Sequence, residues 1–434
     1  MKHLLNSSFR ASLLKNSSIQ FIWWVIFFPG FFSSDSFAAV EMAKSGELGN
    51  SFTASWALYV RIFSFHGNAI ALLTLINGLV LVYSVTRLGY AIFSARIAAI
   101  SSFLLTLTPV VSGMGITLWH DILMSAGILL ITSFFINIKR DSGQLKKLML
   151  LELVPGGILA TFRPNGLPTI LVFALFYSVF IFMRHRSQIT QTIKLLAKLI
   201  LVTTLVTIIS ANVILGLSPI NASFAKQWMQ FDISCYASTT NGSGFVEKNI
   251  PRIGTTETWK SIEACKFISN AQISPEEAVL AEEFITPAWL QILKVDPFFI
   301  VMTHLKRHAY LNPLPIFGIP KAPFLQSNIE FKDQGIDWRF REIAEKARNL
   351  MRVWNGARGL TGWAGFWFLL TIACAKFGSR ERLIPPILMG LSLMVVLFVV
   401  APIPDGRYTL FVLIAGQLIF IGSILEFLNQ FRKV

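Results

Sequence analysis

Apolar residues occur along this chain in long runs, which short polar stretches separate. Ten of these runs approach the roughly 17–25 residues that a helix needs to cross about 30 Å of hydrocarbon. We expect membrane spans at residues 19–33, 66–86, 97–113, 121–138, 148–162, 167–183, 195–217, 361–377, 385–402 and 409–427. The pattern predicts an all-α polytopic membrane protein, because a helix satisfies its own backbone polar groups in lipid.

Composition agrees with this expectation. Hydrophobic residues make up 54% of the chain and charged residues only 14%, whereas soluble domains carry about 25% charged residues. The formal net charge is +15, but the basic residues do not cluster on one soluble face. The sequence therefore gives little support to nucleic-acid binding.

The distribution of lysine and arginine predicts the orientation. Ten spans put both termini on one side, and if that side is the cytoplasm, the inner segments carry eighteen lysines and arginines and the short outer loops four. Short cytoplasmic loops are the ones that carry such an excess. This orientation, in a plasma membrane, places Asp35, Asp121, Arg163 and Arg407 on the outer side.

One long polar segment divides the chain. We expect an N-terminal transmembrane module at 1–217, a mostly helical extracytoplasmic domain at 218–360 and further transmembrane helices at 361–434. Within the polar segment, Ser274-Pro275 and Asp296-Pro297 each read as a helix start, and the second helix is expected to run to about Tyr310. Cys235 and Cys265 both lie there, and an oxidising outer side predicts a disulfide between them.

The first 38 residues also fit a secretory leader. Ser36-Phe37-Ala38 has the small residues of a cleavage site, and cleavage there would remove Asp35. The long polar leader and the bulky aromatic apolar stretch favour a retained first span instead.

The first candidate for chemistry is Asp35, where the first span gives way to a polar loop after Pro29-Gly30. Partial burial at the membrane surface would raise the pKa of such a carboxylate and make it a better general base. The alternatives are a solvated acid or an N-cap for a surface helix at 36–45.

Three further outer turns carry polar residues. His120 and Asp121 open the fourth span, where the alternative is an interfacial Trp119–His120 belt with Asp121 as helix cap. Arg163 and Asn165 form a tight turn, and an arginine offers a two-pronged fork to phosphate. Arg407 and Tyr408, before the last span, could hold a phosphate or a sugar; at both turns a plain turn with an interface anchor is the alternative.

Charged residues also occur in the segment His304–His308 and at Glu152, outside these outer turns. The segment His304–His308 is basic and would suit an anionic lipid head group, although a solvated face lying on the bilayer is the simpler reading. Glu152 lies within a predicted span, and we expect it to reach the cytoplasmic surface. The chain has no GxSxG elbow, Walker A loop, HExxH motif or clear metal-ligand cluster.

The order of these short motifs resembles the GT-C glycosyltransferases, and in particular their bacterial branch. The motifs are Pro29-Gly30 with Asp35-Ser36, Trp119-His120-Asp121, Arg163-Pro164-Asn165-Gly166 and Arg407-Tyr408. The resemblance covers residues 20–185 best and returns at 296–310 and 402–410. The acidic pair and the His-Pro of many relatives are absent from the first loop, where Trp56 and Arg61 occur instead, so the cofactor stays unknown and a divalent metal stays open.

The resemblance implies an inverting transferase that moves a sugar from a polyprenyl-phosphate carrier to an acceptor on a glycan, a lipid or a protein. It implies Asp35 as general base and Asp121 as a second catalytic residue that orients the sugar or the acceptor hydroxyls, with His120, Arg163, Asn165, Arg407 and Tyr408 binding substrate. A transporter or flippase of a lipid-linked saccharide is the main alternative, and it predicts a polar path across the membrane. An envelope-assembly scaffold is a third, and for it Asp35 would be dispensable.

Overall fold

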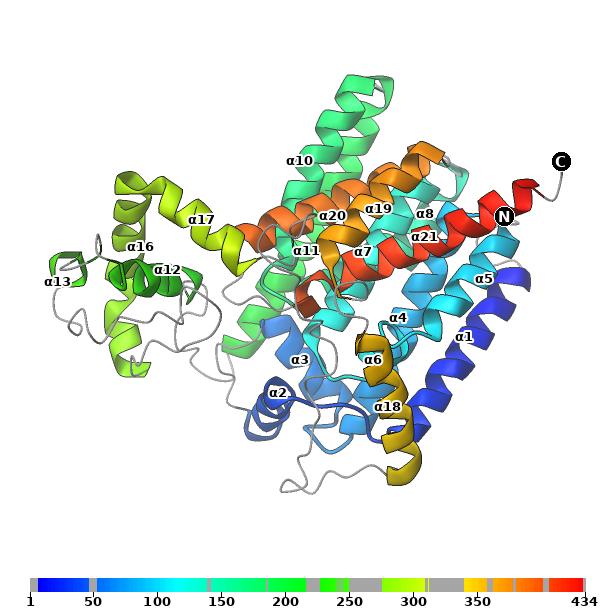
Figure 1. Ribbon diagram of the computed structural model, residues 1–434, viewed down its shortest axis with the longest axis horizontal. Helices are drawn as coiled ribbons and strands as arrows, with labels where there is room; N and C mark the ends of the chain where they lie inside the picture. Colours follow the sequence, from blue (N-terminus) through cyan, green and yellow to red (C-terminus); the bar gives the residue numbers. More distant parts are fainter. Residues whose placement is uncertain are drawn as a thin grey trace.

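The structure is a computed structural model that describes residues 7–46, 53–138, 142–184, 186–215, 227–239, 242, 245–249, 275–308, 311, 339–356, 362–377, 380–400 and 406–431. These residues are almost all helical, and no strand occurs among them. Figure 1 shows a bundle of long helices with a smaller group of helices at one side. The all-α class is therefore confirmed for the described part of the chain.

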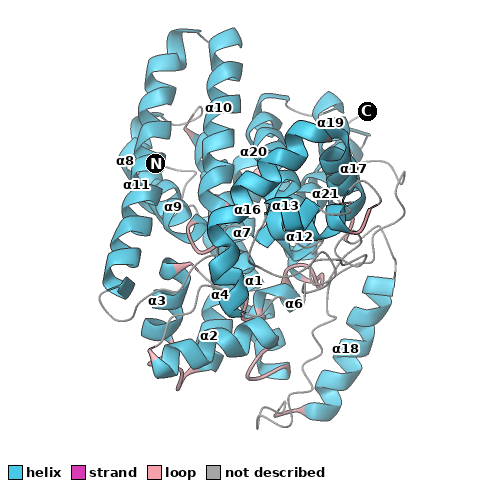
Figure 2. Ribbon diagram, turned by 90° about the vertical axis from the view of Figure 1, so that its left-hand side faces the viewer, coloured by secondary structure: helices cyan, strands magenta, loops and turns pink. Residues whose placement is uncertain are grey.

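Six helices are long and apolar enough to cross a membrane, or seven if the bent pair α16–α17 counts as one span. The six helices are α4 (Ile70–Ile92), α7 (His120–Asn137), α10 (Gly166–Arg184), α11 (Ile189–Leu215), α20 (Arg380–Val400) and α21 (Leu410–Phe431). α7 lies at the centre, with all but its last residue buried. Figure 2 shows α10 and α11 side by side, projecting beyond the other helices.

These six helices coincide with six of the ten predicted spans, and the other four are shorter or more polar than predicted. Those regions fold as α1 (Ser7–Ile26), α5 (Ala95–Thr106) with α6 (Ser112–Gly115), α8 (Leu145–Leu148) with the π-helical turn η2 (Met149–Leu153) and α9 (Val154–Ala160), and α19 (Ala364–Phe377). The apolar run at 97–113 is interrupted between α5 and α6, where Pro109 has no N–H to continue a helix. The count of ten spans is thus not confirmed.

The first helix begins in the stretch that the hydropathy pattern assigned to a polar leader. Ser12, Asn16 and Gln20 are buried on α1 at a spacing of four, which places them on one face. Asn16 donates to Thr86 Oγ1 at 3.0 Å, and Gln20 donates to the Ser112 carbonyl at 3.1 Å. α1 therefore packs through a hydrogen-bonded polar stripe.

An ion pair is buried deep in the bundle. Arg87 on α4 contacts Glu152 in η2, and the side chains are 3% and 0% exposed. Asn137, the last residue of α7, donates to Glu152 Oε1 at 3.1 Å. Arg87, just past the predicted span 66–86, thus lies on the helix itself, and the expectation that Glu152 reaches the cytoplasmic surface is wrong, because the two charges pair inside the protein.

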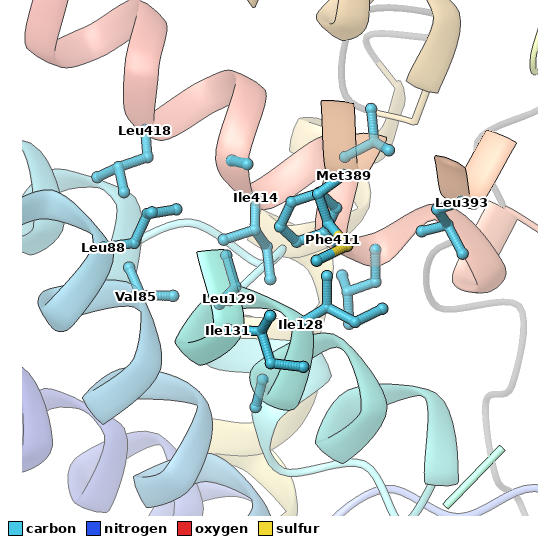
Figure 3. Close-up of a cluster of buried hydrophobic side chains, with 14 of the residues drawn as sticks. Val85, Leu88, Ile128, Leu129, Ile131, Met389, Leu393, Phe411, Ile414 and Leu418 are labelled. Atoms are coloured by element: carbon cyan, nitrogen blue, oxygen red, sulfur yellow. The ribbon is translucent and has the colours of Figure 1, made fainter. Parts of the chain in front are cut away.

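Apolar side chains fill the middle of the bundle. Figure 3 shows side chains from α4, α7, α20 and α21 meeting there, among them Val85, Ile128, Ile131, Phe411 and Ile414. On α7 this layer lies between Asp121 in the first turn and Asn137 at the end. Those two residues are about 24 Å apart along the helix axis.

A smaller helical group, here called the α12–α17 unit, has its own apolar core. It consists of α12 (Gln227–Ala237), α13 (Phe245–Asn249), α16 (Pro275–Val295) and α17 (Pro297–Arg307). Both predicted helix starts are confirmed: α16 begins at Pro275, and Asp296 caps α17 by accepting from the Phe299 N–H at 2.9 Å. Cys235 is disulfide-bonded, but the partner that we predicted for it, Cys265, lies outside the described residues, as do Ser274 and Tyr310.

Candidate functional site

A short backbone bridge brings the first loop against the start of α7. Phe31 N–H donates to the Ile116 carbonyl and Leu118 N–H donates to the Phe31 carbonyl, both at 2.9 Å. Gly30 permits this approach, because its φ is +125° and a Cβ there would lie 2.7 Å from the Ile116 carbonyl oxygen. The bridge holds the beginnings of α2 (Ser34–Ser45) and α7 side by side.

Asp35 lies in the first turn of α2 but does not cap it. The N-cap is Ser33, which forms a reciprocal capping box with Ser36. Trp119 Nε1 donates to Ser33 Oγ at 2.6 Å, so the cap is tied to the start of α7. The N-cap alternative for Asp35 is therefore wrong, and its carboxylate faces Arg407 instead.

Asp121 is fully buried at the start of α7, where it pairs with Arg163. Asp121 lies in the first turn of α7, where a carboxylate suits the helix dipole, but it is not the N-cap residue: Trp119 occupies that position and makes no side-chain cap. Arg163 Nη1 also lies 2.8 Å from His120 Nε2. Because a guanidinium only donates, that Nε2 accepts, and His120 is a neutral imidazole with its hydrogen on Nδ1.

Arg163 comes from the turn between α9 and α10. Gly166 N–H donates to the Arg163 carbonyl at 3.0 Å, and a Cβ on Gly166 would overlap the Ala160 carbonyl oxygen. The turn is therefore pressed tightly onto the end of α9. On its other side the Arg163 guanidinium lies 3.7 Å from the centre of the Tyr408 ring, a stacking that suits a planar cation.

Arg407 joins the two carboxylates. It lies in the 3₁₀ turn η9 (Gly406–Thr409), with Nη1 2.6 Å from Asp35 Oδ2 and Nε 3.8 Å from Asp121 Oδ2. Its guanidinium is also 5.0 Å from the centre of the Trp119 ring. The Asp35 side chain is 37% exposed and that of Asp121 is 0% exposed, so of the two carboxylates only that of Asp35 is accessible from outside.

Asn165 and Trp56 add buried polar atoms to this region. The Asn165 side chain is buried, and neither its amide nitrogen nor its oxygen has a hydrogen-bond partner in the described structure. Trp56, on α3 (Ala54–Phe63), packs edge-on against His120 with ring centres 5.9 Å apart. The sequence offered no specific signal for Trp56 beyond its place in the first loop.

Six of the seven residues that the sequence singled out thus meet in one contact network, and Asn165 lies in the same turn as Arg163. They come from α2, α7, the α9–α10 turn and η9, which are far apart in the chain. Two arginines balance two carboxylates around a neutral His120. Among the described residues no group of three or more His, Cys, Asp or Glu side chains could hold a metal ion, and the neighbouring residues 402–405 lie outside the description.

The basic segment His304–His308 does not present the expected cationic surface. Lys306 is exposed, but His304 and Arg307 on α17 and the C-cap residue His308 are buried. They face Asp232 and the end of α20 instead of solvent or lipid. A buried acid on α12, which the sequence pattern did not indicate, accounts for this difference.

Comparison of the chain with protein-family models, with curated proteins and with solved structures finds no match.

Proposed function

We propose that this protein is an inverting glycosyltransferase that takes a sugar from a polyprenyl-phosphate carrier. The observation that carries the proposal is the network of Asp35, Arg407, Asp121 and Arg163 at one end of an apolar helix bundle. It combines a partly exposed carboxylate with two arginines held in fixed positions. A membrane enzyme that acts on a lipid phosphate needs this combination of a base and a phosphate-binding cation.

In the proposed orientation the site lies at the outer face of a plasma membrane and both termini lie in the cytoplasm. The α12–α17 unit is then extracytoplasmic, as is the rest of the 218–360 segment. The bias of lysine and arginine toward one side supports this arrangement. So does the disulfide at Cys235, because disulfides persist on the oxidising side of a membrane.

Asp35 acts as the general base. It takes the proton of an acceptor hydroxyl as the hydroxyl oxygen forms a bond to the anomeric carbon of the donor sugar. The bond from that carbon to the phosphate oxygen breaks on the opposite face, and the carrier phosphate leaves with the electron pair. In-line attack inverts the anomeric centre, and such a base contributes about 10²–10⁴-fold to the rate.

Arg163 and Arg407 bind the departing phosphate and stabilise the charge that develops on it. The buried, paired state of Asp121 suits a positioning role, in which its carboxylate aims both arginines and does not touch the substrate. A phosphate that engages Arg407 also competes with its 2.6 Å contact to Asp35. Donor binding would therefore free the base at the moment when it is needed.

The packing of the bundle favours an enzyme over the alternative transporter. A transport path needs polar groups along its length, but no charged residue lies between Asp121 and the end of α7. Fully buried Ile128, Leu129 and Ile131 occupy that interval, in the apolar layer of Figure 3. Beyond this layer, Arg87 and Glu152 neutralise each other's charge.

Carrier binding tests the proposal. We would measure the affinity of the purified full-length chain in lipid nanodiscs for a polyprenyl monophosphate and for the uncharged polyprenol. We expect tighter binding of the phosphate, and a loss of at least about tenfold in Arg163→Gln and Arg407→Gln, since each charged hydrogen bond contributes about 1.5–3 kcal/mol. Arg186→Gln, in the 3₁₀ turn η3 (Arg186–Gln188) just beyond the far end of α10, is the matched control and should bind as the wild type does. Equal affinity for phosphate and alcohol would overturn the assignment of the two arginines.

A further inference from the structure

A second buried network, separate from the candidate site, joins the α12–α17 unit internally. Asp232 Oδ2 accepts a hydrogen bond from Trp289 Nε1 at 2.9 Å and lies 2.8 Å from His304 Nε2. Its Oδ1 lies 2.8 Å from Arg307 Nη1. Burial raises the pKa of Asp232, but the hydrogen bond from His304 and the charge of Arg307 outweigh it, so the pKa falls below its ordinary range. Asp232 is therefore an anion.

His304 also reaches out of the unit to α20. Its Nδ1 lies 2.6 Å from the carbonyl oxygen of Phe398. Because α20 ends at Val400, this carbonyl is one of the last four of the helix and has no partner within it. The His304 ring also packs against the Phe398 ring, with centres 5.6 Å apart.

The two partners of His304 determine its protonation. A backbone carbonyl only accepts hydrogen bonds, and so does an ionised carboxylate. Both ring nitrogens must therefore donate, which makes His304 an imidazolium in this arrangement. Its charge lies at the carbonyl end of α20, where the helix dipole favours cations.

We propose that the Asp232–His304–Arg307 cluster is a proton-dependent latch that holds the α12–α17 unit on the end of α20. Loss of a proton from His304 leaves a ring lone pair facing either the Phe398 carbonyl or the Asp232 carboxylate, so one contact becomes repulsive. The other groups around His304 are the His308 ring, whose centre is 5.9 Å away, and the Trp228 ring at 6.4 Å. Only Asp232 and His308 among these partners can change charge alongside His304, since Arg307 stays protonated.

The sign of the pH dependence follows from these groups. Protonated His304 holds the latch, and loss of its proton as the pH rises releases it. Asp232 acts in the opposite sense: because its folded-state pKa is lowered, its contribution is present above the ordinary carboxyl value of about 3.9 and is lost as the pH falls through the lowered value. The docked state is therefore favoured in mildly acidic solution and weakened at both extremes.

Release of the latch has a consequence for the candidate site. This consequence rests on the proposed function. Phe398 lies in the last turn of α20, and the chain runs from there into η9 with Arg407 and Tyr408. Fixing that end of α20 restricts where η9 can lie. His304 and Asp232 would thus act as positioning residues for Arg407 without touching substrate.

A distance measurement tests the latch independently of any transfer activity. We would place nitroxide labels at Leu290→Cys on α16 and Leu391→Cys on α20, both exposed positions, with the free Cys374 replaced by serine. Pulsed electron resonance on the full chain in nanodiscs at about pH 5.5 and about pH 9 brackets the imidazole range. We expect one docked distance at the lower pH and a second, longer population at the higher pH, with the docked-to-released ratio falling at least about tenfold.

Two variants make the test specific. His304→Gln should show the same distribution at both pH values, because it cannot change charge, whereas His66→Gln, at an exposed histidine, should keep the wild-type response. A wild-type distribution that does not change with pH would overturn the latch. So would a His304→Gln chain that still responds as the wild type does. Because the readout is a distance, these outcomes are independent of whether the protein transfers a sugar.

Discussion

At the scale of single residues, the two acids of the site have different environments. Asp35 is partly exposed and makes one close contact, to Arg407, whereas Asp121 is fully buried between two arginines. The sequence presents both simply as acids at the outer ends of apolar segments. In the proposed mechanism these environments correspond to two roles, in which Asp35 meets the substrate and Asp121 holds the arginines that bind it.

Arg163 allows a test of shape as distinct from charge. We predict that Arg163→Lys lowers the transfer rate by about 10²–10³-fold, because an ammonium keeps the charge but loses the planar stacking on Tyr408 and the bond to His120. The transfer rate of the purified chain, with membrane abundance matched, measures this effect. Arg186→Lys should leave the rate unchanged. A fully active Arg163→Lys chain would show that only charge matters at this position.

At the scale of elements, polar contacts inside the bundle decide where several helices lie. The serine, asparagine and glutamine stripe of α1 and the π-helical turn around Glu152 both place polar side chains against neighbouring helices. Such residues lower the mean hydropathy of a sequence window, so the predicted apolar segment is shorter than the helix or displaced along it. The periodicity of four along α1 could have revealed its true start, but the pairing of Glu152 with Arg87 depends on the tertiary arrangement.

The buried ion pair gives a prediction about stability. We predict that Glu152→Gln lowers the free energy of unfolding by about 3–5 kcal/mol, because it leaves Arg87 as an unpaired buried charge. Thermal and denaturant unfolding in detergent would measure the loss. Arg87→Met combined with Glu152→Gln should recover most of the stability. If the double variant is no more stable than the single one, the pair is not the reason for the loss.

At the scale of the whole molecule, the sequence predicts the helical class, the six helices that are long and apolar enough to cross a membrane, and the residues that gather at one end. Asp35, His120, Asp121, Arg163, Arg407 and Tyr408 could be grouped because the charge bias put all their loops on one side. Their pairing could not be read from the sequence, since it depends on the Phe31–Thr117 bridge and on how η9 meets α2. The inward turn of His304–His308 was missed for the same reason: its partner, Asp232, lies far away in the chain.

The most direct test of the central claim is to delete the gene, profile the surface glycans of the cell by mass spectrometry, and restore either the wild type or Asp35→Asn at equal membrane abundance. We predict that the wild type returns a missing sugar, while Asp35→Asn does not, because the amide cannot accept the acceptor's proton. Glu41→Gln, an exposed acid on the same helix, should return it fully. A glycan profile that Asp35→Asn restores as well as the wild type would contradict the assignment of Asp35 as the base.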